Sequence, residues 1–81
     1  MDRRERLHQL VRTLQSAQAH VHDIWLEQQG DFETRSPASK ETDAGKASSG
    51  AVFDLEEATQ HIRFAIEHLK DAANSSDIKL A

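Results

Sequence analysis

Five histidines are the side chains of this chain with the clearest capacity for chemistry. A carboxylate-bridged dimetal site in a four-helix bundle needs Glu-x-x-His on two helices and a further glutamate from each of the other two. The chain offers that spacing from Glu5 to His8, whereas Glu57 and His61 are four residues apart. His8 also falls beside the apolar stripe of its helix, not on it. We therefore expect solvated surface histidines, with no metal and no cofactor.

Two of the histidines, His61 and His68, are candidates for a role in assembly. They flank the apolar stripe of the second predicted helix and are placed to face a partner across it. Histidine changes its charge in mild acid, so we predict that these two make the assembly sensitive to pH. The stretch EHLKD at 67–71 does not match the His-x-x-Lys-Gly pattern of phosphotransfer domains, because lysine comes one place early and the glycine is missing. With no catalytic triad arrangement and no glycine-rich phosphate loop, we expect no enzyme.

The first predicted helix runs from about Arg3 to Gln29. Asp2, with Glu5 three residues later, has the spacing of a capping box, and Gly30 is a residue type that commonly ends helices. No proline or glycine interrupts this segment, so we expect it to be continuous. Read in heptads, its a and d positions carry an unbroken apolar stripe, made of Leu7, Leu10, Leu14, Ala17, Val21 and Ile24, with Val11 and Trp25 at e.

A segment from about 31 to 52 separates the two helices and lacks apolar periodicity. It holds the only proline, two of the three glycines and many small or hydroxylated residues, a composition that predicts a mobile linker. Its length permits a simple reversal of the chain or a crossover that would make the two helices parallel. Phe53, Asp54 and Glu57 then have the spacing of a second capping motif.

The second predicted helix runs from about Asp54 to Ala73 and is followed by a short tail over 74–81. Large residues alternate with alanine through three heptads, at Leu55, Ala58, Ile62, Ala65, Leu69 and Ala72. Alanine at every d position removes the side-chain bulk that keeps helix axes apart. We therefore expect another helix to pack closely against this stripe.

The two stripes together predict an all-α protein with a single domain over residues 1–81. One helix pair leaves the far side of each stripe in water, so we expect self-association. Our first choice is a two-helix antiparallel hairpin with a long mobile linker, associating as a homodimeric four-helix bundle. A parallel or crossed-over arrangement stays open, because it would bring the arginines of the first helix to the acidic start of the second. Exposed ion pairs decide little, since each contributes at most about 1 kcal/mol.

Composition and charge exclude several classes of function. The chain has 81 residues and a net charge of −4, so it lacks the basic surface that nucleic-acid binding needs. No apolar run reaches the roughly 20 residues of a membrane span, and the segment MDRRERLHQL lacks the apolar core of a signal peptide. The absence of cysteine excludes a disulfide framework and fits the cytosol. We therefore expect a cytoplasmic protein that binds neither nucleic acid nor membrane.

Apolar residues off the two stripes are candidates for binding another protein, unless the dimer contact itself covers them. Aromatic side chains are favoured at the centres of interfaces. The predicted patch consists of Ile24, Trp25, Leu26, Phe53 and Phe64. The sequence thus favours a non-enzymatic interaction module, an adaptor, regulator or inhibitor, that forms a homodimer or higher oligomer. The alternative is a small metal- or histidine-dependent bundle, with a metal site or a phosphotransfer role.

Overall fold

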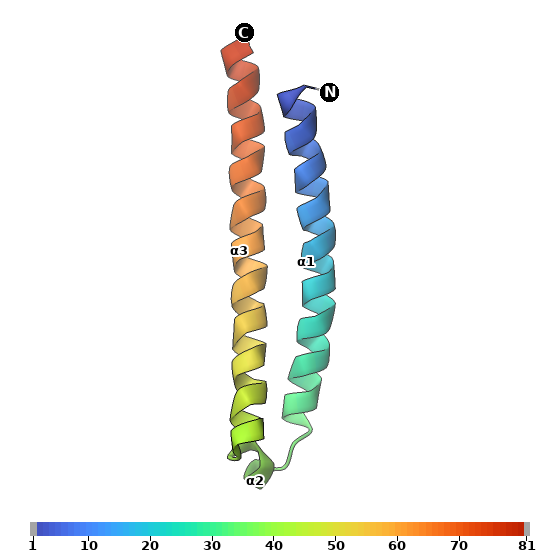
Figure 1. Ribbon diagram of the computed structural model, residues 1–81, viewed down its shortest axis with the longest axis vertical. Coiled ribbons are helices and arrows are strands. Elements are labelled where there is room, and N and C mark those ends of the chain that lie inside the picture. The colour runs from blue at the N-terminus through green and yellow to red at the C-terminus, as the bar shows by residue number, and fades with distance from the viewer. Residues whose placement is uncertain (1, 81) are drawn as a thin grey trace.

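The computed structural model is a hairpin of two long helices with a short helix at the turn (Figure 1). It describes residues 2–80, and the surroundings of the side chains of residues 2–75. Helix α1 spans Arg3–Glu33, α2 spans Pro37–Lys40 and α3 spans Asp43–Leu80. Helices α1 and α3 pack side by side and antiparallel, and the molecule measures 62 × 15 × 13 Å. The expectation of an all-α hairpin is therefore confirmed.

Helix α1 begins where the sequence predicts and ends later than predicted. The Glu5 amide donates a hydrogen bond to Asp2 Oδ1 at 2.8 Å, which caps the helix. At the other end α1 continues for three residues past Gly30, which is helical. Phe32 explains the extension, because it continues the inward stripe and the Lys40 ammonium lies 5.1 Å from the centre of its ring. Burial of the ring offsets the roughly 1 kcal/mol that glycine costs inside a helix.

The segment 31–52, predicted as a linker, is largely helical in the structure, so that prediction is corrected. Helix α2 starts with a cap, since the Ser36 hydroxyl accepts a hydrogen bond from the Ser39 amide at 3.1 Å. The following proline occupies a position where its missing N–H removes no helical hydrogen bond. Helix α3 also starts with a cap, because the Thr42 hydroxyl accepts a hydrogen bond from the Gly45 amide at 3.1 Å. Two capped helix starts thus replace most of the expected loop.

Helix α3 is longer than predicted at both ends. It begins before the predicted start at Asp54 and continues past the predicted end at Ala73. Contact with α1 stabilises the added turns at the start, since Ser48 is buried and its hydroxyl accepts a hydrogen bond from Gln28 Nε2 at 2.9 Å. Most of the predicted tail over 74–81 is therefore helix, and its last residue lies outside the described residues.

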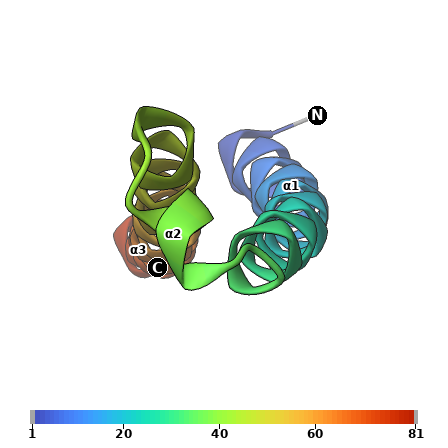
Figure 2. The ribbon, with the colours of Figure 1, turned by 90° about the horizontal axis from the view of Figure 1, so that it is seen from below.

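Helix α2 lies at the turn end of the hairpin against the start of α3, and a short loop connects it to α1 (Figure 2). Its backbone approaches α3 at Gly45, which is buried. A Cβ atom on Gly45 would overlap the Ser39 carbonyl oxygen and lie 2.7 Å from Lys40 Cα. Glycine is therefore required at this junction for steric reasons.

The two long helices meet along their a and e positions, whereas the sequence predicts contact along a and d. Val11 and Ile66, both at e, are 7% and 5% exposed, while Leu10, at d, is 51% exposed. In α3 the d positions are all alanine, whereas the e positions include Val52 and Ile66. Burying the e row therefore removes more apolar area from water than burying the d row would. We call this contact the a/e seam, and it is made of Leu7, Val11, Leu14, Val21 and Trp25 in α1 and Leu55, Ile62, Ile66, Leu69 and Ala73 in α3.

Candidate protein-interaction surfaces

A second row of residues, at the d and g positions, lies about a quarter turn from the a/e seam on each long helix. Because α1 and α3 run antiparallel, their d and g rows fall on the same side of the hairpin. Leu10 and Ile24, at d in α1, are each 51% exposed. Ala58 and Ala65, at d in α3, are half-buried. We call this surface the d/g face.

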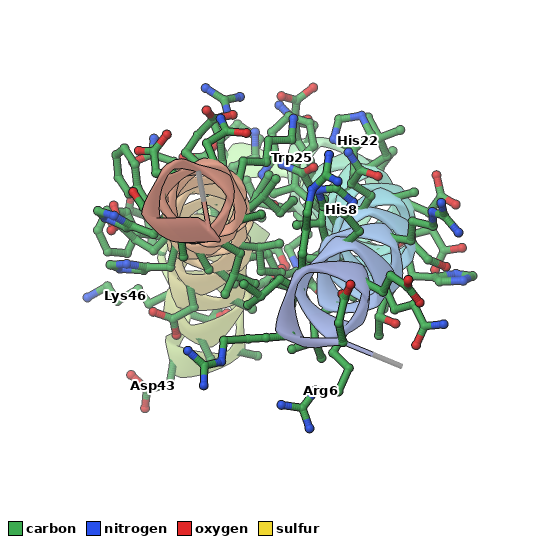
Figure 3. The ribbon with its side chains drawn as sticks, turned by 90° about the horizontal axis from the view of Figure 1, so that it is seen from above. Arg6, His8, His22, Trp25, Asp43 and Lys46 are labelled. Atoms are coloured by element: carbon green, nitrogen blue, oxygen red, sulfur yellow. The ribbon has the colours of Figure 1, made fainter. Side chains whose placement is uncertain are left out.

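Trp25 lies at the edge of the a/e seam, on the side opposite to Arg6 (Figure 3). Its ring stacks on that of His22, with centroids 5.6 Å apart and planes 22° apart. The indole Nε1 is buried and has no hydrogen-bond partner among residues 2–75. Both rings border a hollow of about 210 Å³, which is lined on α3 by Glu56, Thr59, Gln60 and Arg63. Trp25 therefore belongs mainly to the contact between the helices.

Two exposed phenylalanines lie on the outer side of α3. Phe53 is 59% exposed and Phe64 is 58% exposed. They are about three helical turns apart and share one strip of the helix surface. Between them, Glu57 Oε2 lies 3.7 Å from His61 Nε2, an ion pair when the histidine is protonated. We call the surface formed by Phe53, Glu57 and Phe64 the outer strip of α3.

The five residues predicted as one patch lie on different sides of the hairpin. Ile24 belongs to the d/g face, and Trp25 borders the hollow on the opposite side. Leu26 is 50% exposed and points away from the a/e seam. The structure thus brings Phe53 and Phe64 onto one surface and separates the other three from them.

All five histidines are exposed. His8 and His22 lie at b, on the side of Trp25, whereas His20, His61 and His68 lie at g, on the d/g face. Within the part of the chain that the structure describes, no group of three or more histidine and acidic side chains is placed to hold a metal ion. The role of His61 and His68 in a pH-sensitive contact stays a prediction.

The sequence prediction missed Leu10 as a surface residue, together with the charges that flank the same row. Extending the heptad count outward from Leu10 and Ile24 places Arg3 and Asp31 at d as well. This signal is present in the sequence, but it lies beyond the apolar members of the stripe.

Comparison with known proteins gives no match, since no family model, no curated protein and no solved structure is significantly similar to this chain. Among residues 2–80, no helix combines the length and the apolar character needed to cross a membrane.

Proposed function

We propose that this chain is a non-enzymatic protein–protein interaction module that acts as a homodimeric four-helix bundle. The observation that supports the proposal is the exposure of Leu10 and Ile24 on a hairpin only 15 × 13 Å across. Among the residues whose side chains are described, the buried apolar ones are Val11, Ile66 and Ala73. So thin a core is typical of a chain that completes its packing with a partner.

Association through the d/g face would supply the missing burial. Full burial of a leucine or isoleucine side chain contributes roughly 1.5 to 3 kcal/mol. A second hairpin on this face would cover Leu10 and Ile24 in both chains at once. The same contact would cover Ala58 and Ala65, which a single hairpin leaves half in water.

The outer strip of α3 lies outside the a/e seam and the d/g face, so it stays accessible in such a dimer. Two exposed aromatic rings on one helix surface are typical of the anchors that fill pockets in another protein. We assign Phe53 and Phe64 to this second contact, through which the dimer would act as an adaptor, regulator or inhibitor. We place this activity in the cytoplasm, because the chain contains no cysteine.

The docking role is tested with the double variant Phe53→Ala, Phe64→Ala. Both side chains are exposed, so the variant should keep its helicity by circular dichroism and its mass by sedimentation. It should lose any protein that the natural chain recovers from its native source. Leu26→Ala, at a residue that is 50% exposed, is the matched control and should retain that protein. Equal recovery by the double variant and the natural chain would contradict the assignment.

A further inference from the structure

The d/g row of α1 carries opposite charges at its two ends. Arg3 and Arg6 stand near the amino-terminal end, and Glu27 and Asp31 stand near the carboxy-terminal end. All four side chains are exposed, and none of them forms an ion pair with residues 2–75. Their charges are therefore available to a second molecule.

These charges oppose the dipole of their own helix. The amino end of a helix favours acidic side chains and the carboxy end favours basic ones. In α1 only Glu5 follows this rule in the first turn, whereas Arg3 and Arg6 oppose it there and in the next turn. The last turn contains Asp31 and Glu33 and no basic residue. An antiparallel neighbour with the same row would bring its acidic end to these arginines and so compensate the unfavourable placement.

Between the charged ends, the d residues are symmetric about Ala17, and the g residues Thr13 and His20 are both polar. Leu10 and Ile24 stand seven residues before and seven residues after Ala17. Reversing the row exchanges arginine with acid and leucine with isoleucine, and it returns Ala17 to its own place. A twofold axis perpendicular to α1 performs this exchange, because it sets one surface of two identical chains against itself in antiparallel orientation.

We propose that the d/g face binds a second copy of this chain, with α1 antiparallel to the partner's α1 and a twofold axis near Ala17. The facing pairs are Arg3 with the partner's Asp31, Arg6 with the partner's Glu27, and Leu10 with the partner's Ile24. This inference rests on the proposed function, in which the chain acts as a homodimer, and it specifies the face, the orientation and the register.

A hollow on the d/g face lies where this arrangement places the partner's Ile24. Its volume is about 490 Å³, and it is lined by Arg3, Arg6, Leu7, Gln9, Leu10 and Thr13. The leucine side chains of this hollow can contact an aliphatic side chain of the partner. The two guanidinium groups can pair with a carboxylate that lies one helical turn away from it. Ile24 and Glu27, three residues apart on one side of α1, form such a pair.

The same axis brings α3 against the partner's α3. The hydrogen bond between Gln28 and Ser48 fixes how the two helices are aligned within one chain. Ala17 is eleven residues before Gln28, and Thr59 is eleven residues after Ser48, so Ala17 lies near the level of Thr59 along the hairpin. That level falls within a row of alanines at d, which occupies Ala44, Ala51, Ala58, Ala65 and Ala72. Small side chains at every seventh position allow the two helices to approach closely.

A second copy suits this face because the chain itself meets both the charge requirement and the size requirement. The d/g rows extend from Arg3 to Asp31 in α1 and from Ala44 to Ala72 in α3, which is about 42 Å at 1.5 Å per residue, on a molecule 62 Å long. A strip of that length across both helices is comparable in size with the roughly 800 Å² per partner that a stable interface buries. Each helix would contact one neighbour through a and e and another through d and g. The a and d residues of all four helices would then face the axis of the bundle.

Charge reversal tests whether Arg6 faces the partner's Glu27. Arg6→Glu sets acids opposite one another and Glu27→Arg sets bases opposite one another, so each variant should weaken the homodimer roughly tenfold or more. A mixture of the two variants restores opposite charges at both symmetry-related contacts and should form a heterodimer of near-natural affinity. Arg12→Glu, at an exposed f position, makes the same charge change and should leave the affinity unaltered. Failure of the mixture to form the heterodimer, with helicity preserved, would overturn the proposal.

Cysteine cross-linking tests the register, because the chain contains no cysteine of its own. A disulfide forms only between side chains that are brought close together. Ala17→Cys should therefore give a linked dimer under mild oxidation, whereas Ala19→Cys, on the outer side of α1, should not. A protein that sediments as a dimer but links equally at both positions, or at neither, overturns this face and leaves the proposed homodimer standing. A chain that sediments as a folded monomer overturns both.

Discussion

At the scale of single residues, Trp25 combines a favourable and an unfavourable contribution to stability. Its ring stacks on His22, but its buried indole N–H has no hydrogen-bond partner among residues 2–75. An unsatisfied buried donor costs roughly 1 to 3 kcal/mol, so Trp25→Phe should change the free energy of unfolding by less than about 1 kcal/mol. Trp25→Ala loses the ring as well and should cost about 2 to 3 kcal/mol. Urea denaturation at one fixed chain concentration measures both, and equal losses for the two variants would contradict this interpretation.

The sequence predicts exposure well for residues that lie far from the a/e seam. Phe64 lies at c, opposite the a/e seam, and its exposure follows from the heptad position alone. Leu10 and Trp25 are different, because each apolar stripe is three rows wide, at a, d and e. Periodicity fixes the stripe but does not decide which two of its rows meet the other helix of the same chain. That choice depends on the sizes of the side chains on both helices together.

At the scale of helices, substitutions of the three glycines distinguish a helical junction between α1 and α3 from a mobile linker. Gly45→Ala places a Cβ against the backbone of Ser39 and Lys40 and should cost about 1 to 3 kcal/mol. Gly30 and Gly50 are helical with open space around them, so alanine at either position should add about 0.5 to 1 kcal/mol of stability. Thermal unfolding of the three variants tests this order. If Gly45→Ala and Gly50→Ala behave alike, the segment is not the helical junction described here.

The hydroxyl of Thr42 supplies a second test of the start of α3. It accepts a hydrogen bond from the Gly45 amide, so Thr42→Ala should lower the free energy of unfolding by about 1 kcal/mol. Ser16→Ala is the matched control, because Ser16 is exposed within α1 at a c position, outside the a/e seam and the d/g face. Its effect should be smaller than that of Thr42→Ala. A Thr42→Ala variant as stable as the natural chain would place the true start of α3 elsewhere.

The beginning of α1 could be predicted because Asp2 is a capping residue, Glu5 follows it at the spacing of a capping box, and a long apolar stripe comes next. The beginning of α3 could not, because the residues after Thr42 are small and give no apolar period. Ser36 and Thr42 are themselves cap signals, but a composition of serine, alanine and glycine also describes a linker. Contact with α1, through the Gln28–Ser48 hydrogen bond, is what favours the helix, and such a contact is not visible in the local sequence.

At the scale of the whole molecule, the core of a single hairpin is one layer thick, so its stability should depend on association. A dimer is favoured by mass action, and its melting temperature should therefore rise with chain concentration. Ile24→Lys places a charge in the proposed contact and should remove this dependence while the hairpin stays helical. Phe64→Lys, at an equally exposed apolar residue on the outer strip of α3, should preserve it. A melting temperature that is independent of concentration in the natural chain would contradict the prediction.

The mass of the folded protein in solution shows directly whether the chain forms a homodimer. Sedimentation equilibrium at roughly micromolar to tens of micromolar chain concentration covers the affinities expected of a stable homodimer. We predict a helical species with twice the 9.1 kDa mass of one chain. A fully helical, cooperatively unfolding species of 9.1 kDa across that range would show that the chain is a monomer and contradict the proposed homodimer.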